Sequence, residues 1–234
     1  CFFTKWDIII DFRSSMISYV LFHKKKFIFK KNNISHHLDQ LTDFFEFDCS
    51  NLMIYTNDKE VKEVEKTISK QFKYVVICPG GNWKPKLWAV KNFNKLMKNI
   101  KQNYNNVKFL IVGSLNEKKY YFQDVVNEID KNDIIDLMGA TLTLTSTYMK
   151  KSDLFIGNDS GLMHLSVASN LATIGLFGPT NDKIYAPKGN NCFVVRTNED
   201  YEYFQKNICE PSKSYMQSIN TENITDLIKK NKLL

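Results

Sequence analysis

The chain has 234 residues, 43% of them hydrophobic, so it can bury a substantial core and is not a wholly disordered protein. Lysine and arginine outnumber aspartate and glutamate by 32 to 25. The resulting net charge of +7 favours anionic partners such as nucleotides, phosphorylated glycans, membrane surfaces or nucleic acid, although a merely solvated lysine-rich surface would give the same balance.

The predicted elements alternate between strand and helix along the chain. Up to residue 70 we predict strands at 6–12, 27–29 and 51–55, and helices at 14–23, 38–47 and 58–69. Beyond it we predict strands at 74–78, 107–112, 134–137, 153–156, 172–176 and 192–195. Helices are predicted there at 88–101, 116–130, 142–151 and 222–231, with one more between the strands at 153–156 and 172–176.

This repeated strand–helix order predicts parallel sheets covered by helices on both faces, and therefore an α/β protein. A connection near residue 71 separates two units of this kind, which we expect to be domains 1–70 and 71–234. The sequence begins at Cys1, directly before a strand-like run. We interpret it as lacking the front of its first domain.

The five cysteines are scattered and include no Cys-x-x-Cys pair, which favours neither a zinc site nor a disulfide framework. We therefore expect a reducing, cytosolic setting. No apolar run approaches the roughly 18 residues that a membrane-spanning helix needs. The lysines at 24–26, 30 and 31 would suit an anionic acceptor or lipid headgroups, or would only flank a strand.

One polar turn follows the strand at 153–156 and opens the next helix with the sequence Asn158-Asp159-Ser160-Gly161. A side-chain oxygen of Asp159 or Ser160 could cap the helix, and Gly161 allows close approach of the backbone. The helix N-terminus would suit a phosphate, and in open α/β sheets ligands lie at the carboxyl ends of strands. Alone, such a turn is more often an ordinary cap than a site.

A second turn, Pro79-Gly80-Gly81-Asn82, follows the strand at 74–78. Its glycines would let backbone N–H groups converge on a phosphate, although Gly-Gly turns are common. Lys86 comes soon afterwards, and one ammonium group there could reach a diphosphate oxygen. From charge alone, the neighbouring lysines are equal candidates.

Two further residues could contact a ligand. Glu117 follows the strand end at Gly113-Ser114, where a carboxylate suits ribose hydroxyls but is equally a favourable first-turn residue against the helix dipole. His164 lies one helical turn after Ser160 on the same face. A lone helical histidine is usually a bystander, so neither residue identifies a site without other evidence.

Two motifs, in order along the chain, resemble the signature of glycosyltransferase family 9, the lipopolysaccharide heptosyltransferase family. The first combines the turn at 78–82 with Lys86, Trp88 and Phe93. The second combines 158–165 with Phe177-Gly178-Pro179-Thr180 and Tyr185-Ala186-Pro187. Two separated motifs in the right order are more specific than either alone. The resemblance is strong over 74–187 and implies the GT-B fold, two facing Rossmann-like domains with parallel sheets, the N-terminal one incomplete.

The resemblance implies an inverting glycosyltransferase that moves a heptose or related sugar from a nucleoside diphosphate, ADP in most of the family, to a lipopolysaccharide core acceptor. Domain 1–70 would lie on the acceptor side, and domain 71–234 would bind the nucleotide sugar. The implied donor-binding residues are Gly80, Gly81, Asn82, Lys86, Glu117, Ala140, Ser160, Gly161 and His164. Lys86 and Asp159 are the implied catalytic residues. Ala140 belongs to a loop, 138–142, that would lie against the base.

The family's general base is an aspartate early in the first domain, which we expect to lie upstream of this sequence, so that transfer by this chain would be slow or absent. Arg13 and Ser14, at the end of the first strand, are candidates for acceptor contact. The chain contains no Asp-x-Asp, and we expect neither a metal nor a cofactor, since a lysine, amides and a helix N-terminus can stabilise a diphosphate.

The expected partners are an ADP-heptose-like donor, an anionic lipid-linked oligosaccharide acceptor and, peripherally, the inner face of the inner membrane. Three alternatives stay open. A non-catalytic nucleotide-sugar- or glycan-binding protein would share the fold, whereas an epimerase would need carboxylates and a histidine placed for proton abstraction, and no such set is evident. A nucleic-acid binder rests only on net charge and lacks a basic-aromatic motif, so we expect no nucleic-acid partner.

Overall fold

The computed structural model describes residues 3–234, which contacts divide into two compact units between Ser50 and Asn51. The expected boundary near residue 70 lies inside the second unit, because α3 (Asp58–Thr67) packs against α6 (Leu142–Met149). Cys1, the residue at which the sequence begins, is outside the described residues. Among residues 3–234, no helix is both long enough and apolar enough to cross a membrane.

The first unit is a strand–helix–strand motif followed by one more helix. Its elements are β1 (Trp6–Asp11), α1 (Ile17–Val20), β2 (His23–Ile28) and α2 (His37–Phe45), and β1 pairs with β2 in parallel. An aromatic cluster packs α2 against the strand ends, with ring centroids 4.9 to 6.4 Å apart; its members are Phe12, Phe29, Phe44 and Phe45.

The lysines at 24–26 lie within β2, which corrects two expectations. The helix predicted at 14–23 shortens to four residues, and the strand predicted at 27–29 begins earlier, because the parallel ladder with β1 already starts at His23. Lys24 forms a surface ion pair with Asp7 at 2.5 Å, and Lys26 Nζ lies 3.7 Å from the centroid of the Tyr19 ring. Lys24, Lys25 and Lys26 are therefore part of the strand, whereas Lys30 and Lys31 follow its end.

The second unit is built on a six-stranded parallel sheet in the order β5-β4-β3-β6-β7-β8. The strands are β3 (Lys73–Cys78), β4 (Val107–Gly113), β5 (Ile134–Met138), β6 (Leu154–Asn158), β7 (Ala172–Phe177) and β8 (Cys192–Arg196). In chain order this is the doubly wound arrangement that reverses direction between the first and fourth strands, here β3 and β6. Ligands bind at the carboxyl ends of strands beside such a reversal.

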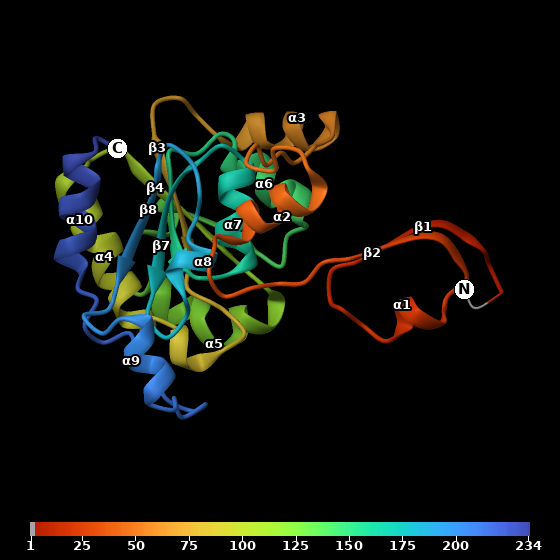
Figure 1. Ribbon diagram of the computed structural model, residues 1–234. Coiled ribbons are helices and arrows are strands. Elements are labelled where there is room, and N and C mark those ends of the chain that lie inside the picture. The colour runs from red at the N-terminus through yellow and green to blue at the C-terminus, as the bar shows by residue number, and fades with distance from the viewer. Residues whose placement is uncertain (1–2) are drawn as a thin grey trace. The chain divides into compact units, whose positions relative to one another are not determined.

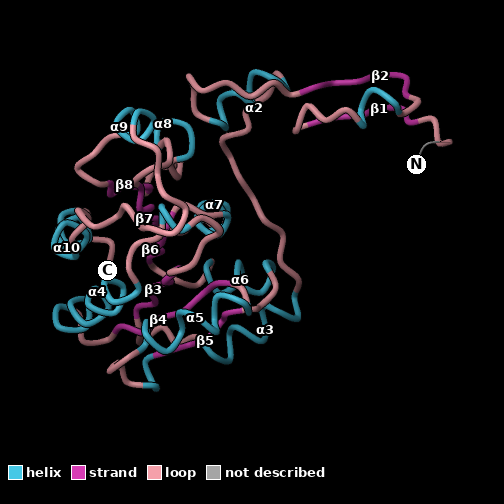
Figure 2. The backbone as a smooth tube through the Cα atoms, turned by 90° about the horizontal axis from the view of Figure 1, so that it is seen from below, coloured by secondary structure: helices cyan, strands magenta, loops and turns pink. Residues whose placement is uncertain are grey.

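Helices cover both faces of this sheet (Figures 1 and 2). One face carries α4 (Val90–Asn103), α5 (Leu115–Val126) and α10 (Thr221–Lys230), and the other carries α3, α6 and α7 (Gly161–Ala168). Alternate side chains of β3 enter the two cores, Val75 and Ile77 on one face and Val76 and Cys78 on the other. This three-layer arrangement follows from strands that are apolar on both sides.

The expected helices and sheet strands of this unit are present, but the strand predicted at 51–55 is wrong. Residues 51–57, which we call the strap, pair with neither sheet among the described residues. Four short helices were not anticipated from the sequence: η1 (Lys84–Lys86), η2 (Lys131–Asp133), α8 (Asp182–Tyr185) and α9 (Tyr201–Lys206). Elements of three to six residues carry too little periodicity to be recognised.

Candidate functional site

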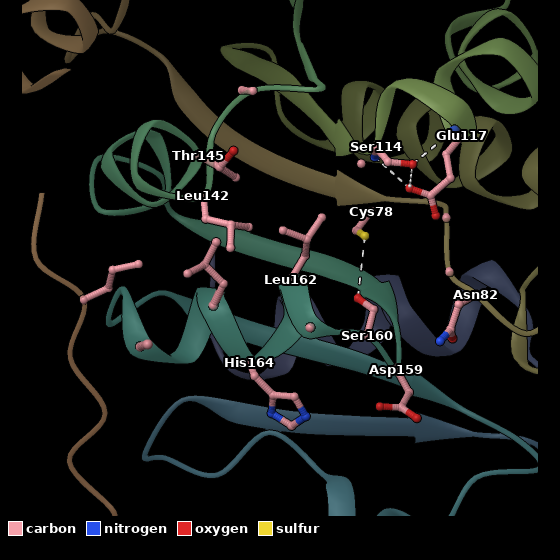
Figure 3. Close-up of a pocket in the computed structure, with 18 of the residues that line it drawn as sticks. Cys78, Asn82, Ser114, Glu117, Leu142, Thr145, Asp159, Ser160, Leu162 and His164 are labelled. Carbon is pink, nitrogen blue, oxygen red and sulfur yellow. Dashed lines mark hydrogen bonds between the residues drawn. The ribbon is translucent and has the colours of Figure 1, made fainter. Parts of the chain in front are cut away.

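A cavity of about 1190 Å³ lies at the carboxyl ends of β3, β4 and β6. It brings together all the residues expected to bind a donor nucleotide. These are Gly80, Gly81, Asn82, Lys86, Glu117, Ala140, Ser160, Gly161 and His164, and Asp159, which was expected to be catalytic, lines the cavity too. Figure 3 shows this cavity, with Asn82, Glu117 and Asp159 towards one side and Leu142 towards the other. The two glycine-bearing turns therefore face a common cavity because β3 and β6 are neighbours in the sheet.

Asn158 fastens the two turns to each other. Its side chain is fully buried at the end of β6, and its Nδ2 donates to the carbonyls of Pro79 at 2.8 Å and Gly80 at 3.3 Å. Its Oδ1 accepts from the backbone N–H of Trp88 at 3.0 Å. One amide thus fixes both the start of the first turn and the chain that follows Lys86.

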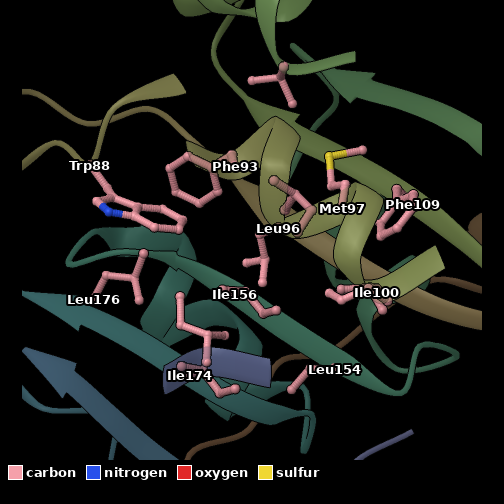
Figure 4. Close-up of a cluster of buried hydrophobic side chains, with 14 of the residues drawn as sticks. Trp88, Phe93, Leu96, Met97, Ile100, Phe109, Leu154, Ile156, Ile174 and Leu176 are labelled. Carbon is pink, nitrogen blue, oxygen red and sulfur yellow. The ribbon is translucent and has the colours of Figure 1, made fainter. Parts of the chain in front are cut away.

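Trp88 packs in the core and does not line the cavity. Its side chain is 1% exposed, and its ring meets Phe93 edge-on with centroids 5.0 Å apart (Figure 4). Its indole Nε1 donates to the carbonyl of Ile219 at 3.0 Å. The residue therefore anchors the segment after Lys86 to the hydrophobic core.

Lys86 and Asp159 form an ion pair at the edge of the cavity. Lys86 Nζ lies 3.3 Å from Asp159 Oδ2, and the two side chains are only 13% and 10% exposed. Lys86 ends a short 3-10 turn with Pro85 inside it, whose carbonyl accepts from the N–H of Tyr215. Because a carboxylate repels phosphate, an anion bound here would be drawn to the Lys86 ammonium group and would keep away from Asp159, which offsets part of that attraction.

The start of α7 differs from the expected side-chain cap. Ser160 is the residue before the helix, but within residues 3–234 its side chain makes no capping hydrogen bond. Instead Ser160 Oγ lies 3.8 Å from Cys78 Sγ on the neighbouring strand. Neither candidate oxygen thus caps this helix, and its N-terminus borders the cavity at Gly161. A helix N-terminus without a side-chain cap offers N–H groups to an anion.

Cys78 lines the cavity but is not a reactive thiol. Burial raises its pKa to about 12, although the contact with Ser160 works in the opposite direction. The thiol therefore stays protonated at neutral pH, and a protonated thiol is a poor nucleophile.

We expect iodoacetamide at pH 8 to modify Cys78 much more slowly than Cys209, which is half-buried, because thiolate is scarce and access is blocked at Cys78. Mass spectrometry of the alkylated peptides measures both rates on one sample. Equal labelling of the two cysteines in the folded protein would contradict the burial that we describe.

Glu117 has the structural role that the sequence left open. Ser114 and Glu117 form a capping box at the start of α5, in which Glu117 Oε2 accepts from the Ser114 backbone N–H at 2.7 Å and from its hydroxyl at 2.8 Å. The same carboxylate packs against Gly80 and Gly113, so that it lies beneath the first turn. A ligand contact through Oε1 stays a prediction.

Gly80→Ala should lower the free energy of unfolding by about 1–3 kcal/mol, because a Cβ at Gly80 would overlap the Glu117 carboxylate, which the capping box holds in place. Urea denaturation measures the effect. Gly161→Ala is the matched control, since a Cβ there meets nothing within 4 Å and stability should be unchanged. A Gly80→Ala protein as stable as the wild type would show that Glu117 is free to move.

The cavity has an apolar arm that sequence reasoning largely missed. The strap contributes Leu52, Met53 and Ile54, and other elements contribute Leu115, Ala140, Leu142, Leu162, Leu165 and Ala168. The expected position of Ala140 at the cavity agrees with this lining. The other positions read as ordinary helix or strand residues, and we predicted residues 51–55 of the strap as a strand.

The loop after β7 is held by a half-buried arginine. Arg196 pairs with Asp182 and donates from Nη2 to the carbonyl of Gly178 at 2.7 Å. Thr180, in this loop, lines the cavity, and its buried hydroxyl makes no hydrogen bond within the described part of the chain. The loop therefore shapes the cavity, and the hydroxyl of Thr180 is a buried, unsatisfied polar group at its edge.

Arg13 and Ser14 lie in the first unit, after β1. The Ser14 hydroxyl donates to the carbonyl of Phe29 at 3.1 Å, and the Arg13 backbone N–H donates to Asp11 at 2.8 Å. That N–H and the neighbouring Ser18 and Ser15 groups hold the pKa of Asp11 below its usual range. These contacts give the turn a structural role, and an acceptor contact of Arg13 or Ser14 stays a prediction.

A doubly wound parallel sheet with a cavity at its switch point is the architecture of the Rossmann-like α/β proteins. The model of glycosyltransferase family 9 (heptosyltransferase) matches residues 3–214. The chain belongs to this family, which confirms the resemblance drawn from the two motifs and supports a glycosyltransferase.

The chain is 26% identical over 191 residues to lipooligosaccharide heptosyltransferase 2 of Campylobacter jejuni, covering 75% of this chain and 59% of that protein. A family 9 glycosyltransferase structure from Veillonella parvula superimposes with a TM-score of 0.76 at 18% identity, over 96% of this chain and 73% of that one. The structure of the Escherichia coli heptosyltransferase WaaC with ADP superimposes with a TM-score of 0.65 at 12% identity. The match covers 97% of this chain and 73% of that one. These structures confirm the expected α/β, GT-B fold class.

Proposed function

We propose that the chain carries the donor site of a heptosyltransferase that moves a heptose or related sugar from a nucleoside diphosphate, ADP-heptose first, to a lipopolysaccharide core acceptor. The observation that carries this proposal is the Lys86–Asp159 pair beside the start of α7. A cation and a helix N-terminus without a side-chain cap at one end of a cavity suit a diphosphate. A structural relative that was solved with ADP adds support for the nucleotide.

In the proposed reaction, the acceptor hydroxyl attacks the anomeric carbon from the face opposite the diphosphate, so the configuration inverts. The bond from that carbon to the diphosphate oxygen breaks, and its electron pair leaves with the diphosphate. Lys86 and the N–H groups at the start of α7 offset the charge that grows on this oxygen. Asp159 orients Lys86 and meets sugar hydroxyls, and Glu117 Oε1 meets the ribose.

The acceptor hydroxyl must lose its proton to a base. Asp11 does not suit this role, because N–H and hydroxyl donors already occupy its carboxylate oxygens and lower its pKa. We therefore assign the base to no described residue. The donor site and the proton acceptor are separate parts of the proposed mechanism, and each can be tested without the other.

We further propose that transfer needs no metal, since Lys86 and backbone N–H groups can supply the positive charge. A chelator such as EDTA should then leave the rate unchanged. We place the reaction in the cytoplasm at the inner face of the inner membrane. Phe22 and Phe27, 66% and 47% exposed beside the lysines of β2, support a peripheral membrane contact.

The test of this function combines binding and transfer. The protein is titrated with ADP by calorimetry, and then incubated with ADP-heptose and a heptose-free lipopolysaccharide core. We expect transfer to be slow, since the base is assigned to no described residue; mass spectrometry detects one added heptosyl residue, and NMR of the new anomeric centre reports inversion. ADP binding without transfer would favour a non-catalytic nucleotide-sugar-binding protein. Absence of both would exclude the proposed function.

A further inference from the structure

The strap, residues 51–57, is an extended segment with a regular alternation of burial. Leu52, Ile54 and Thr56 are half-buried, whereas Met53 and Tyr55 are 65% and 82% exposed. A strand in a sheet would satisfy its backbone through a neighbouring strand. The strap pairs with neither sheet in residues 3–234, so other groups must hold it.

The side chain of Lys150 holds the strap against the end of α6. Lys150, at the end of α6, donates from Nζ to the carbonyl of Ile54 at 2.7 Å and to the hydroxyl of Thr56 at 3.5 Å. Directly after the strap, Glu60 Oε1 accepts from the Thr143 hydroxyl at 2.7 Å, at the start of α6. The strap itself is therefore fastened to the end of α6 through Ile54 and Thr56, and α3, which follows the strap, contacts the start of the same helix.

The strap lines the cavity together with the loop after β5 and the starts of α6 and α7. Leu52 and Ile54 belong to its apolar arm, and Ala140, Leu142 and Leu162 line the arm from other elements. Figure 3 shows Leu142 on the side of the cavity remote from Asn82 and Asp159. An arm with apolar walls suits a flat heterocyclic ring, since such a ring gains most from removing its faces from water.

We propose that the strap is a wall of the binding site: Leu52 and Ile54 close the apolar arm over the heterocyclic ring of the ligand, and Lys150 holds the strap closed. The inference rests on the proposed function in one respect, which is that the ring is the base of a nucleotide. Lys150 touches no ligand and is a positioning residue. Ligand binding and strap docking then favour each other.

The experiment compares Lys150→Met with the wild type by calorimetric titration with ADP. Without the latch the docked state is populated less, and the apparent affinity falls with that population, by about five-fold. Lys151→Met is the matched control, because Lys151 is the next residue and makes only a partly exposed ion pair with Glu65 at 3.3 Å. The affinity of the Lys151→Met protein for ADP should stay within about two-fold of the wild type.

Limited chymotrypsin digestion gives a second readout on the same proteins. Cleavage after Tyr55 should slow when ADP is present and should be faster in Lys150→Met than in the wild type without ADP. An ADP affinity of Lys150→Met within two-fold of the wild type, or no protection of Tyr55 by saturating ADP, would overturn the role of the strap alone. A wild-type protein that binds no ADP would overturn the proposed function and the strap inference together.

Discussion

Lys86→Ala is expected to weaken the binding of ADP about ten-fold or more, because a charge-assisted contact to an anion contributes roughly 1.5–3 kcal/mol and each 1.4 kcal/mol is a factor of ten. The ammonium group of Lys86 is largely buried beside the cavity, so little solvent screens it. Transfer should fall at least as much, since the same charge is used on the leaving diphosphate. Isothermal calorimetry with ADP measures the binding effect.

Lys84→Ala is the matched control, since Lys84 lies in the same 3-10 turn but is exposed and does not line the cavity. It should bind ADP like the wild type. Removing Lys86 also leaves Asp159 without its partner, and the variant Lys86→Ala with Asp159→Asn separates that repulsion from the lost attraction. An unchanged titration of Lys86→Ala would rule out the role assigned to Lys86.

Asn158→Leu is expected to lower the free energy of unfolding by about 3 kcal/mol or more, because it leaves buried backbone groups without their partners. Those groups are the carbonyls of Pro79 and Gly80 and the N–H of Trp88. The first turn would also lose its attachment to β6, so ADP affinity should fall as well. Urea unfolding followed by circular dichroism measures the stability.

Asn158→Asp separates the two halves of this contact. A carboxylate can still accept from Trp88 but cannot donate to the two carbonyls. Asn82→Ala is the control in the same turn, because Asn82 is exposed and should contribute little to stability. If Asn158→Leu unfolded at the same urea concentration as the wild type, the turn would be held by other contacts.

The sequence predicted the second unit well where its signal is local. The apolar spacing of Phe93, Leu96, Met97 and Ile100 predicts α4 and its buried face, and all four side chains are fully buried. The two glycine-bearing turns follow strands and carry recognisable motifs, so the residues around the cavity could be named in advance. Each of these features depends on neighbours within one or two helical turns.

Contacts between residues far apart in the sequence could not be predicted from local patterns. Asp159 or Ser160 was expected to cap α7, but the Ser160 hydroxyl faces Cys78, which lies 82 positions earlier, and Asp159 pairs with Lys86. Half-buried and exposed residues alternate along the strap as they do in a strand. The strap could join a sheet only if an edge strand lay beside it, and it pairs with neither sheet in residues 3–234. A side chain or backbone group takes the partner that folding brings close, and no local pattern specifies that choice.

The sequence by itself determined the α/β class, the family and the residue types that surround the cavity. Only the tertiary structure decided that Lys86 pairs with Asp159, that Asn158 joins the two turns and that the strap forms a wall. The physical reason is the strand order, because the ladder between β3 and β6 places their carboxyl ends side by side. Lys86 and Asp159, 73 positions apart, thereby come within 3.3 Å of each other, although no local sequence pattern at either residue indicates this pairing.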